Sequence, residues 1–154
     1  MTNPEDKLLQ LGIELPKPVQ PVANYVTHYQ TGNLLFLSGH SFCGAPSAVD
    51  IGKVGADLTA EQGYQAARNA GICVLATLKQ ALGDLSRVKQ IVRVLGMVNA
   101  TENFTQHPTV INGFSDLMVE VFGQKGMHVR SAVGMGSLPG NIAVEIEVTV
   151  EVEA

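Results

Sequence analysis

The segment MHVRSAVGMGSLP, residues 127–139, places one arginine in an otherwise apolar run. Residues two apart share a face of a strand, so Arg130 shares its face with His128, Ala132 and Gly134. A guanidinium stays charged at physiological pH and offers a planar fork of N–H donors that suits a carboxylate. Arg130 is therefore the candidate for binding an anionic ligand. His128, on the same face, could serve as a proton donor or could be an ordinary packed histidine, and the second interpretation ranks higher.

Two carboxylates lie in the strand expected over residues 142–152. Alternation puts its isoleucines and valines on one face, with Glu145 and Glu147 on the other. If this strand and the strand around Arg130 pair as a hairpin, Arg130 and Glu145 share a sheet face. Two interpretations stay open. The arginine could form a solvated cross-strand ion pair with Glu145 or Glu147, worth at most ~1 kcal/mol, or it could face a cleft covered by a partner subunit.

Hydrophobic periodicity and turn signals predict the elements that position these residues. We expect a short helix over 3–11, hairpin strands over 25–31 and 34–39, a loop over 40–58, a helix over about 60–82 after the capping box Thr59-Ala60-Glu61-Gln62, a strand over 88–98, a helix over about 108–122, and strands over 127–135 and 142–152. This order predicts an α+β fold, with one mixed sheet and two helices on one face. Residues 1–154 are expected to form a single domain, with 1–24 as an N-terminal extension.

Composition narrows the function classes. Hydrophobic residues make up 45% and charged residues only 16% of the 154, which suggests a surface covered by a partner chain. The net charge of −4 argues against nucleic-acid binding. Cys43 and Cys73 form no CxxC pair and are expected as reduced thiols, and the histidines show no metal-ligand spacing. No apolar run approaches a membrane span and the N-terminus is polar, so a cytoplasmic protein is expected.

MHVRSAVGMGSLPGNIAVEIEV resembles the C-terminal signature of the reactive intermediate deaminase family (RidA, formerly YjgF). The segments Tyr25-Val26, Gly32-Asn33, Ser38-Gly39 and Val110-Ile111-Asn112 also stand at the family's spacing. The resemblance covers nearly all of the chain and is nearest to a longer subgroup marked by DLT…GYQAAR, VINGFSDLMVEVFG and HVRSAVG. It implies a chorismate mutase-like fold assembled as a homotrimer, with a cleft between each pair of subunits.

Members of this family typically hydrolyse enamines and imines, such as 2-aminoacrylate and 2-iminopropanoate, to a 2-keto acid and ammonia without metal or cofactor. The resemblance implies the same reaction here, on a small carboxylate-bearing imine, and no nucleic-acid partner. It implies that Arg130 binds the substrate carboxylate and that Glu145 positions a water near the imine carbon, with Glu147 as a rival. The substrate-binding positions it implies are Arg130, Tyr25 (from the neighbouring subunit), Gly39, Asn112 and Ala132.

One departure from the family concerns Ala132, since many family deaminases carry a cysteine at this position. Ala132 can keep only a backbone role. Tyr25 could instead cap a strand end, Gly39 could serve a turn with positive φ, and Asn112 could hydrogen-bond a loop. Two other functions remain open: a non-catalytic module that binds a small carboxylate, and, ranked below it, an endoribonuclease or translation inhibitor. The acidic balance and the lack of a basic, aromatic stripe argue against the latter.

Overall fold

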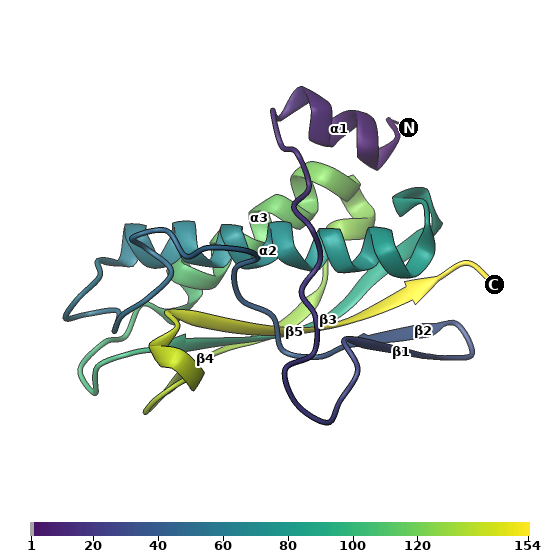
Figure 1. Cartoon of the computed structure of the whole chain (residues 1–154). Coiled ribbons are helices and arrows are strands. Elements are labelled where there is room, and N and C mark those ends of the chain that lie inside the picture. The colour runs from purple at the N-terminus through teal and green to yellow at the C-terminus, as the bar shows by residue number, and fades with distance from the viewer. Residues whose placement is uncertain (1) are drawn as a thin grey trace.

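The computed structural model describes residues 2–154 and contains one five-stranded mixed sheet with helices on one side (Figure 1). Its main elements are α1 (Pro4–Gln10), β1 (His28–Thr31), β2 (Leu34–Leu37), α2 (Ala60–Leu82), β3 (Val88–Asn99), α3 (His107–Phe122), β4 (Val129–Met135) and β5 (Val144–Val152). The predicted α+β architecture and element order are confirmed. The hairpin strands and the last two strands are shorter than expected.

The strand order is β1-β2-β5-β3-β4, and only the β3–β4 pair is parallel. The expected hairpin of β4 and β5 is wrong, because β3 lies between these strands. The reason is α3, which connects β3 to β4. A helical crossover joins parallel neighbours, so β4 takes the free edge of β3. β5 then pairs antiparallel with the other edge of β3.

The core lies between the sheet and the two long helices. Every second residue of β5 is buried against them, from Val144 to Val152. The two helices approach closely at Gly113 of α3, where a β-carbon would lie 1.9 Å from the carbonyl oxygen of Tyr64 on α2. The absence of a side chain at Gly113 lets the two helices pack closely, and α3 also contacts β3 and β4, where the candidate site lies.

Local signals set the helix boundaries. The predicted capping box is confirmed: the Thr59 hydroxyl accepts from the Gln62 N–H, and the Gln62 side chain accepts from the Thr59 N–H. Gly83 ends α2 with a φ of 79°. Pro108 lies in the first turn of α3, where its missing N–H costs no helical hydrogen bond.

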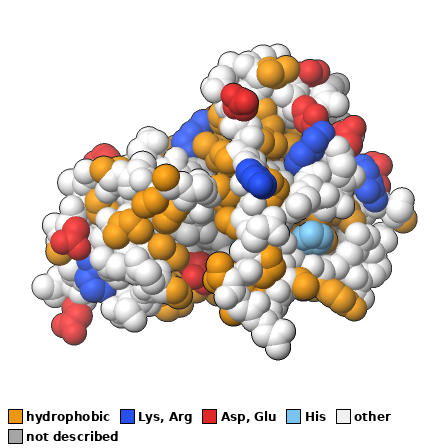
Figure 2. Space-filling view, in the orientation of Figure 1, with side chains coloured by type: hydrophobic (Ala, Val, Ile, Leu, Met, Phe, Trp, Pro, Cys, Tyr) orange, Lys and Arg blue, Asp and Glu red, His pale blue; other side chains and the backbone are white. Residues whose placement is uncertain are grey.

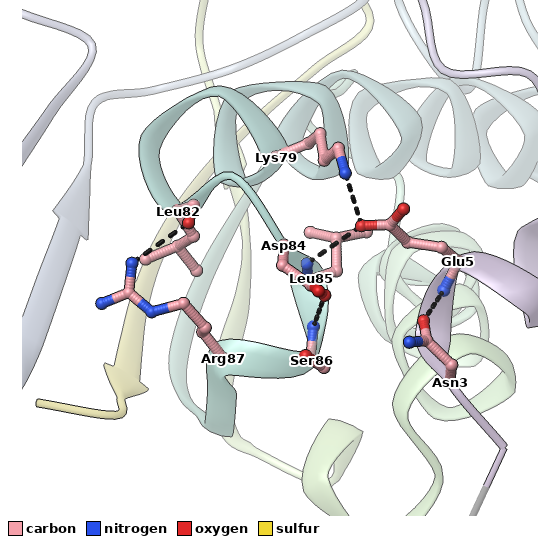
Figure 3. A network of polar contacts seen from close by, with 8 residues as sticks. All are labelled: Asn3, Glu5, Lys79, Leu82, Asp84, Leu85, Ser86 and Arg87. Atoms are coloured by element: carbon pink, nitrogen blue, oxygen red, sulfur yellow. Dashed lines mark hydrogen bonds and ion pairs between the residues drawn. The ribbon is translucent and has the colours of Figure 1, made fainter.

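The N-terminal helix α1 packs beyond the two long helices (Figure 1). Asn3 caps it by accepting from the Glu5 N–H. The Glu5 carboxylate accepts from Lys79 Nζ at 2.6 Å and from the Leu85 N–H at 3.3 Å, as Figure 3 shows. These bonds, together with the burial of Leu8, fix α1 to the C-terminal end of α2.

The two cysteines depart from the prediction. Cys43 and Cys73 form a disulfide, with their Cα atoms 5.3 Å apart, so the expectation of reduced thiols is wrong. The segment 40–58 folds back onto α2, which brings two cysteines 30 positions apart into bonding range. Asp50 of the same segment accepts from Ser47 and from Asn69 of α2. This loop is therefore tied to α2, and the cysteines give no argument for a reducing compartment.

The side of the sheet that faces away from the helices is the open face. Among the described residues no α-helix covers it (Figure 1). Large apolar side chains lie on it with high exposure: Tyr29 is 67%, Phe36 42% and Val129 64% exposed. Such a row of exposed apolar groups on one face is typical of a surface that a partner covers. Within residues 2–154, no helix is both long and apolar enough for a membrane span.

Candidate functional site

A pocket of about 260 Å³ lies at the edge of the sheet, between α3 and β4. Its lining residues are Asn112, Ser115, Asp116, Val119, Met127, His128 and Arg130. Arg130 is half-buried, and its Cα partner on β3 is Val94, which is fully buried under the helices. Partners in register point to the same side of a sheet, so Arg130 points toward α3.

Arg130 is held by α3 without a carboxylate. Its Nη1 donates to Ser115 Oγ at 2.9 Å, and its Nη2 donates to the Pro108 carbonyl at 3.4 Å. No ion pair within residues 2–154 involves Arg130, so the alternative interpretation of a cross-strand ion pair with Glu145 or Glu147 finds no support there. Two of the five N–H donors are engaged, which leaves donors for a ligand.

His128 belongs to the same hydrogen-bond chain. Its Nδ1 lies 2.7 Å from the Gly126 carbonyl, which only a protonated Nδ1 can satisfy. Nε2 is then an acceptor, and the Ser115 hydroxyl lies 2.8 Å from it. Burial lowers the pKa of His128; the Gly126 bond opposes this, and the charge of Arg130 lowers it further. A neutral imidazole therefore accepts from Ser115 at pH 7.

Asp116 also lines this pocket and adds a negative charge to it. Its carboxylate accepts from the Tyr64 hydroxyl at 2.7 Å, a bond that raises the pKa of Tyr64. Asp116 is thus engaged by α2 and forms no ion pair with Arg130 in the described chain. The pocket keeps an arginine that no neighbouring carboxylate neutralises directly.

The second group of predicted residues lies on the open face. Glu145 is half-buried there, and a β-carbon on Gly39 would lie 2.4 Å from its Oε2. Gly39 does not have a positive φ, so the interpretation that it serves a turn with positive φ is wrong. The missing side chain of Gly39 instead makes room for the Glu145 carboxyl. Burial raises the pKa of Glu145, and the nearby charge of Glu147 raises it further. Glu147 is exposed, so the surroundings of the two glutamates differ.

The structure separates Arg130 from Glu145. The Cα partner of Glu145 on β3 is Met97, three positions from Val94 and therefore on the opposite face. The prediction that both side chains share one face is wrong within a single chain. The cause is the inverted pattern of β4: its larger residues, such as Val129 and Val133, face the open side, and its small residues face the helices.

The remaining predicted residues divide between the two groups. Asn112 lines the Arg130 pocket from α3. Ala132 lies two residues after Arg130, opposite Gly96, and packs against the core. Tyr25 is exposed just before β1 and lines no part of that pocket. Arg130, Asn112 and Ala132 therefore form one group, and Gly39 and Glu145 form another.

Ser115 is the pocket residue that the sequence did not reveal. Ser115 lies one helical turn after Asn112. Its spacing in the sequence does not distinguish it from any other polar residue on a helix face. Only the register of β4 against α3 shows that it lies between Arg130 and His128. Among the described residues, no group of three or more His, Cys, Asp or Glu side chains is arranged to hold a metal ion.

The sequence matches the model of a known protein family. The model of the YjgF/chorismate mutase-like family, whose description adds a provisional endoribonuclease activity, matches residues 5–151. The chain belongs to this family. Protein TCP17 of Trypanosoma cruzi is 41% identical to it over 145 residues, which is 94% of this chain and 91% of that protein.

Two solved structures are similar to this chain over nearly their whole length. Protein Atu1372 of Agrobacterium tumefaciens, of unknown function, is 38% identical with a TM-score of 0.90, covering 97% of this chain and 92% of that one. A Shewanella oneidensis protein provisionally described as an endoribonuclease is 35% identical with a TM-score of 0.93, covering 98% and 100%. The YjgF fold expected from the sequence is thus confirmed.

Proposed function

We propose that this protein hydrolyses small carboxylate-bearing enamines and imines to 2-keto acids and ammonia. The observation that carries the proposal is Arg130, whose guanidinium lies in a pocket, is fixed by Ser115 and Pro108, and has no carboxylate partner in the described chain. A bidentate arginine holds a planar carboxylate in one orientation. Membership of the YjgF family supports the same conclusion.

The reaction needs orientation more than a strong nucleophile. In 2-iminopropanoate, to which 2-aminoacrylate tautomerises, the protonated imine carbon is already electrophilic. Water adds to that carbon and gives up one proton to a carboxylate, which passes the proton to the amino nitrogen. The C–N bond then breaks as the hydroxyl oxygen forms the keto C=O, and the hydroxyl proton goes to the departing ammonia, which leaves as ammonium. Glu145 suits the transfer, because its raised pKa brings it nearer to neutral pH. Holding the substrate carboxylate fixes the reacting carbon against the water.

The two groups of residues meet only if a second copy of the chain contributes to the pocket. Arg130 and Glu145 lie on opposite faces of one sheet, so a cleft between copies is the arrangement that can join them. The exposed apolar residues of the open face support such an assembly, and the low charge content agrees with it. We include the homotrimer and Tyr25 from a neighbouring copy in this proposal.

The test is ammonia release from 2-aminoacrylate, generated in situ from serine by a serine dehydratase. Arg130→Ala should lower the rate roughly 100-fold, and Arg130→Lys should recover only part of it, since lysine lacks the planar fork. Arg68→Ala is the matched control: it removes an arginine that pairs with Glu120 and does not line the Arg130 pocket. Full activity in Arg130→Ala would refute the assignment.

A non-catalytic carboxylate-binding module is the second candidate, and the separation of Arg130 from Glu145 favours it if the chain acts as a monomer. It predicts thermal stabilisation by pyruvate without turnover of imines. An endoribonuclease finds less support. On the face shown in Figure 2, lysines and arginines lie apart among acidic residues and form no continuous basic stripe for a phosphate backbone.

A further inference from the structure

Arg130 depends on a hydrogen-bond chain that ends on the backbone. The chain runs from Arg130 Nη1 to Ser115 Oγ, from the Ser115 hydroxyl to His128 Nε2, and from His128 Nδ1–H to the Gly126 carbonyl. Each bond fixes the direction of the next. The Gly126 carbonyl sets the imidazole tautomer, the imidazole sets the hydroxyl proton, and the hydroxyl lone pair then faces the guanidinium.

We propose that Ser115 and His128 are positioning residues of the carboxylate site, and that His128 couples carboxylate capture to uptake of a proton. This inference rests on the proposed function and adds two residues that its reaction does not itself require. The three elements that carry the chain are α3, β4 and the short turn of residues 123–126. Phe114 contacts the imidazole edge-on, with ring centroids 6.1 Å apart, and limits its movement.

The coupling follows from the charges around His128. The charged side chains that share its pocket are Arg130 on β4 and Asp116 on α3, and Asp116 is engaged by Tyr64. A bound carboxylate offsets the charge of Arg130, which is one of the causes that lower the pKa of His128. Binding should therefore raise that pKa. By linkage, the affinity of the protein for a carboxylate ligand should increase as the pH falls through the pKa of His128.

Pyruvate is the probe for the first experiment, and methyl pyruvate, which lacks the carboxylate, is its control. The imidazole signal of His128 is followed by NMR against pH and assigned from its loss in His128→Gln. We expect the His128 titration midpoint to move upward by several tenths of a pH unit or more with pyruvate, and to stay fixed with methyl pyruvate. In Arg130→Ala, pyruvate should leave the midpoint unchanged.

Variants test the positioning role separately. Ser115→Ala should raise the dissociation constant for pyruvate about tenfold, since it removes an acceptor from a charged donor. His128→Gln keeps an acceptor in reach of the Ser115 hydroxyl and should bind pyruvate more tightly than His128→Leu, which has none. Ser86→Ala, an exposed serine outside this pocket, is the control and should bind like the wild type.

The outcomes separate the inference from the proposed function. Arg130-dependent pyruvate binding with a fixed His128 midpoint and no effect of Ser115→Ala would overturn the inference and leave the carboxylate site standing. Absence of pyruvate binding by the wild type would overturn both. If His128→Leu fails to fold, the midpoint shift in the wild type and the affinity of Ser115→Ala still decide the matter.

Discussion

Arg130 and Glu145 lie on opposite faces of one sheet, although both flank the same strand, β3, and their Cα partners on it are only three positions apart. The guanidinium points toward α3, and the carboxyl points to the open face beside Gly39. A chemistry that uses both groups on one small substrate therefore needs two copies of the chain. Under the proposed reaction, the oligomeric state is therefore part of the mechanism.

Association of two copies through the open face can be tested with a single substitution that introduces a charge. We expect the wild type to be a trimer and Phe36→Glu to shift it toward the monomer, because the new charge would be buried without a partner. Light scattering coupled to size exclusion measures the mass. Leu9→Glu, on the outer side of α1 and 77% exposed, is the control and should leave the mass unchanged. A monomeric wild type would contradict the arrangement.

Glu145→Gln should separate activity from stability. Burial and the charge of Glu147 raise the pKa of Glu145, so its charged form is disfavoured in the folded protein. The folded state then binds more protons than the unfolded state just above the ordinary glutamate pKa, and stability falls as the pH rises through that window.

The neutral amide removes this dependence. Glu145→Gln should melt at a higher temperature than the wild type at pH 7 and at about the same temperature near pH 4, while ammonia release is lost. Differential scanning fluorimetry at several pH values measures the first effect. Equal melting temperatures at pH 7 would show that the carboxylate is well solvated, against the burial described above.

Reduction of the Cys43–Cys73 disulfide should destabilise the fold. The bridge closes a loop of about 30 residues between segment 40–58 and α2, which corresponds to about 3–4 kcal/mol on a chain-entropy estimate. Cys43→Ser with Cys73→Ser should lower the urea midpoint accordingly and leave pyruvate binding intact, because neither cysteine lines the Arg130 pocket. An unchanged midpoint would contradict a structural role for the bridge.

The capping box offers a smaller and local effect. Thr59→Ala removes the acceptor of the Gln62 N–H at the start of α2 and should lower the free energy of unfolding by about 1 kcal/mol. Thr59→Ser keeps the hydroxyl and should restore most of it. Chemical denaturation of the two variants side by side measures the difference, and equal stabilities would show that the cap contributes nothing.

Elements with strong local signals were predictable from the sequence. The capping box, Pro108 and the closing glycines predicted the ends of both long helices to within a residue or two. The alternation of residues in β5 predicted which of its faces is buried. These features depend on neighbours in the chain. The family motif singled out Arg130, which lines the pocket between α3 and β4, and its role there stays a prediction.

Strand order and the two sheet faces were not predictable in the same way. The pattern of β4 resembles that of a core-facing strand, but its larger residues face the open side, where a single chain offers no cover. The disulfide, the Gly39–Glu145 contact and the Ser115–His128 bond all join segments far apart in sequence. Their partners are set by register and crossover, which local patterns do not encode.

Subunit mixing tests the central claim most directly. Arg130→Ala and Glu145→Gln are each expected to be inactive, and mixed oligomers of the two contain sites with an intact Arg130 from one copy and an intact Glu145 from another. With equal and random mixing in a trimer, about a quarter of the sites are intact, so ammonia release from 2-aminoacrylate should return to about a quarter of the wild-type rate. Mixed oligomers verified by native mass spectrometry that remain inactive would contradict the shared site.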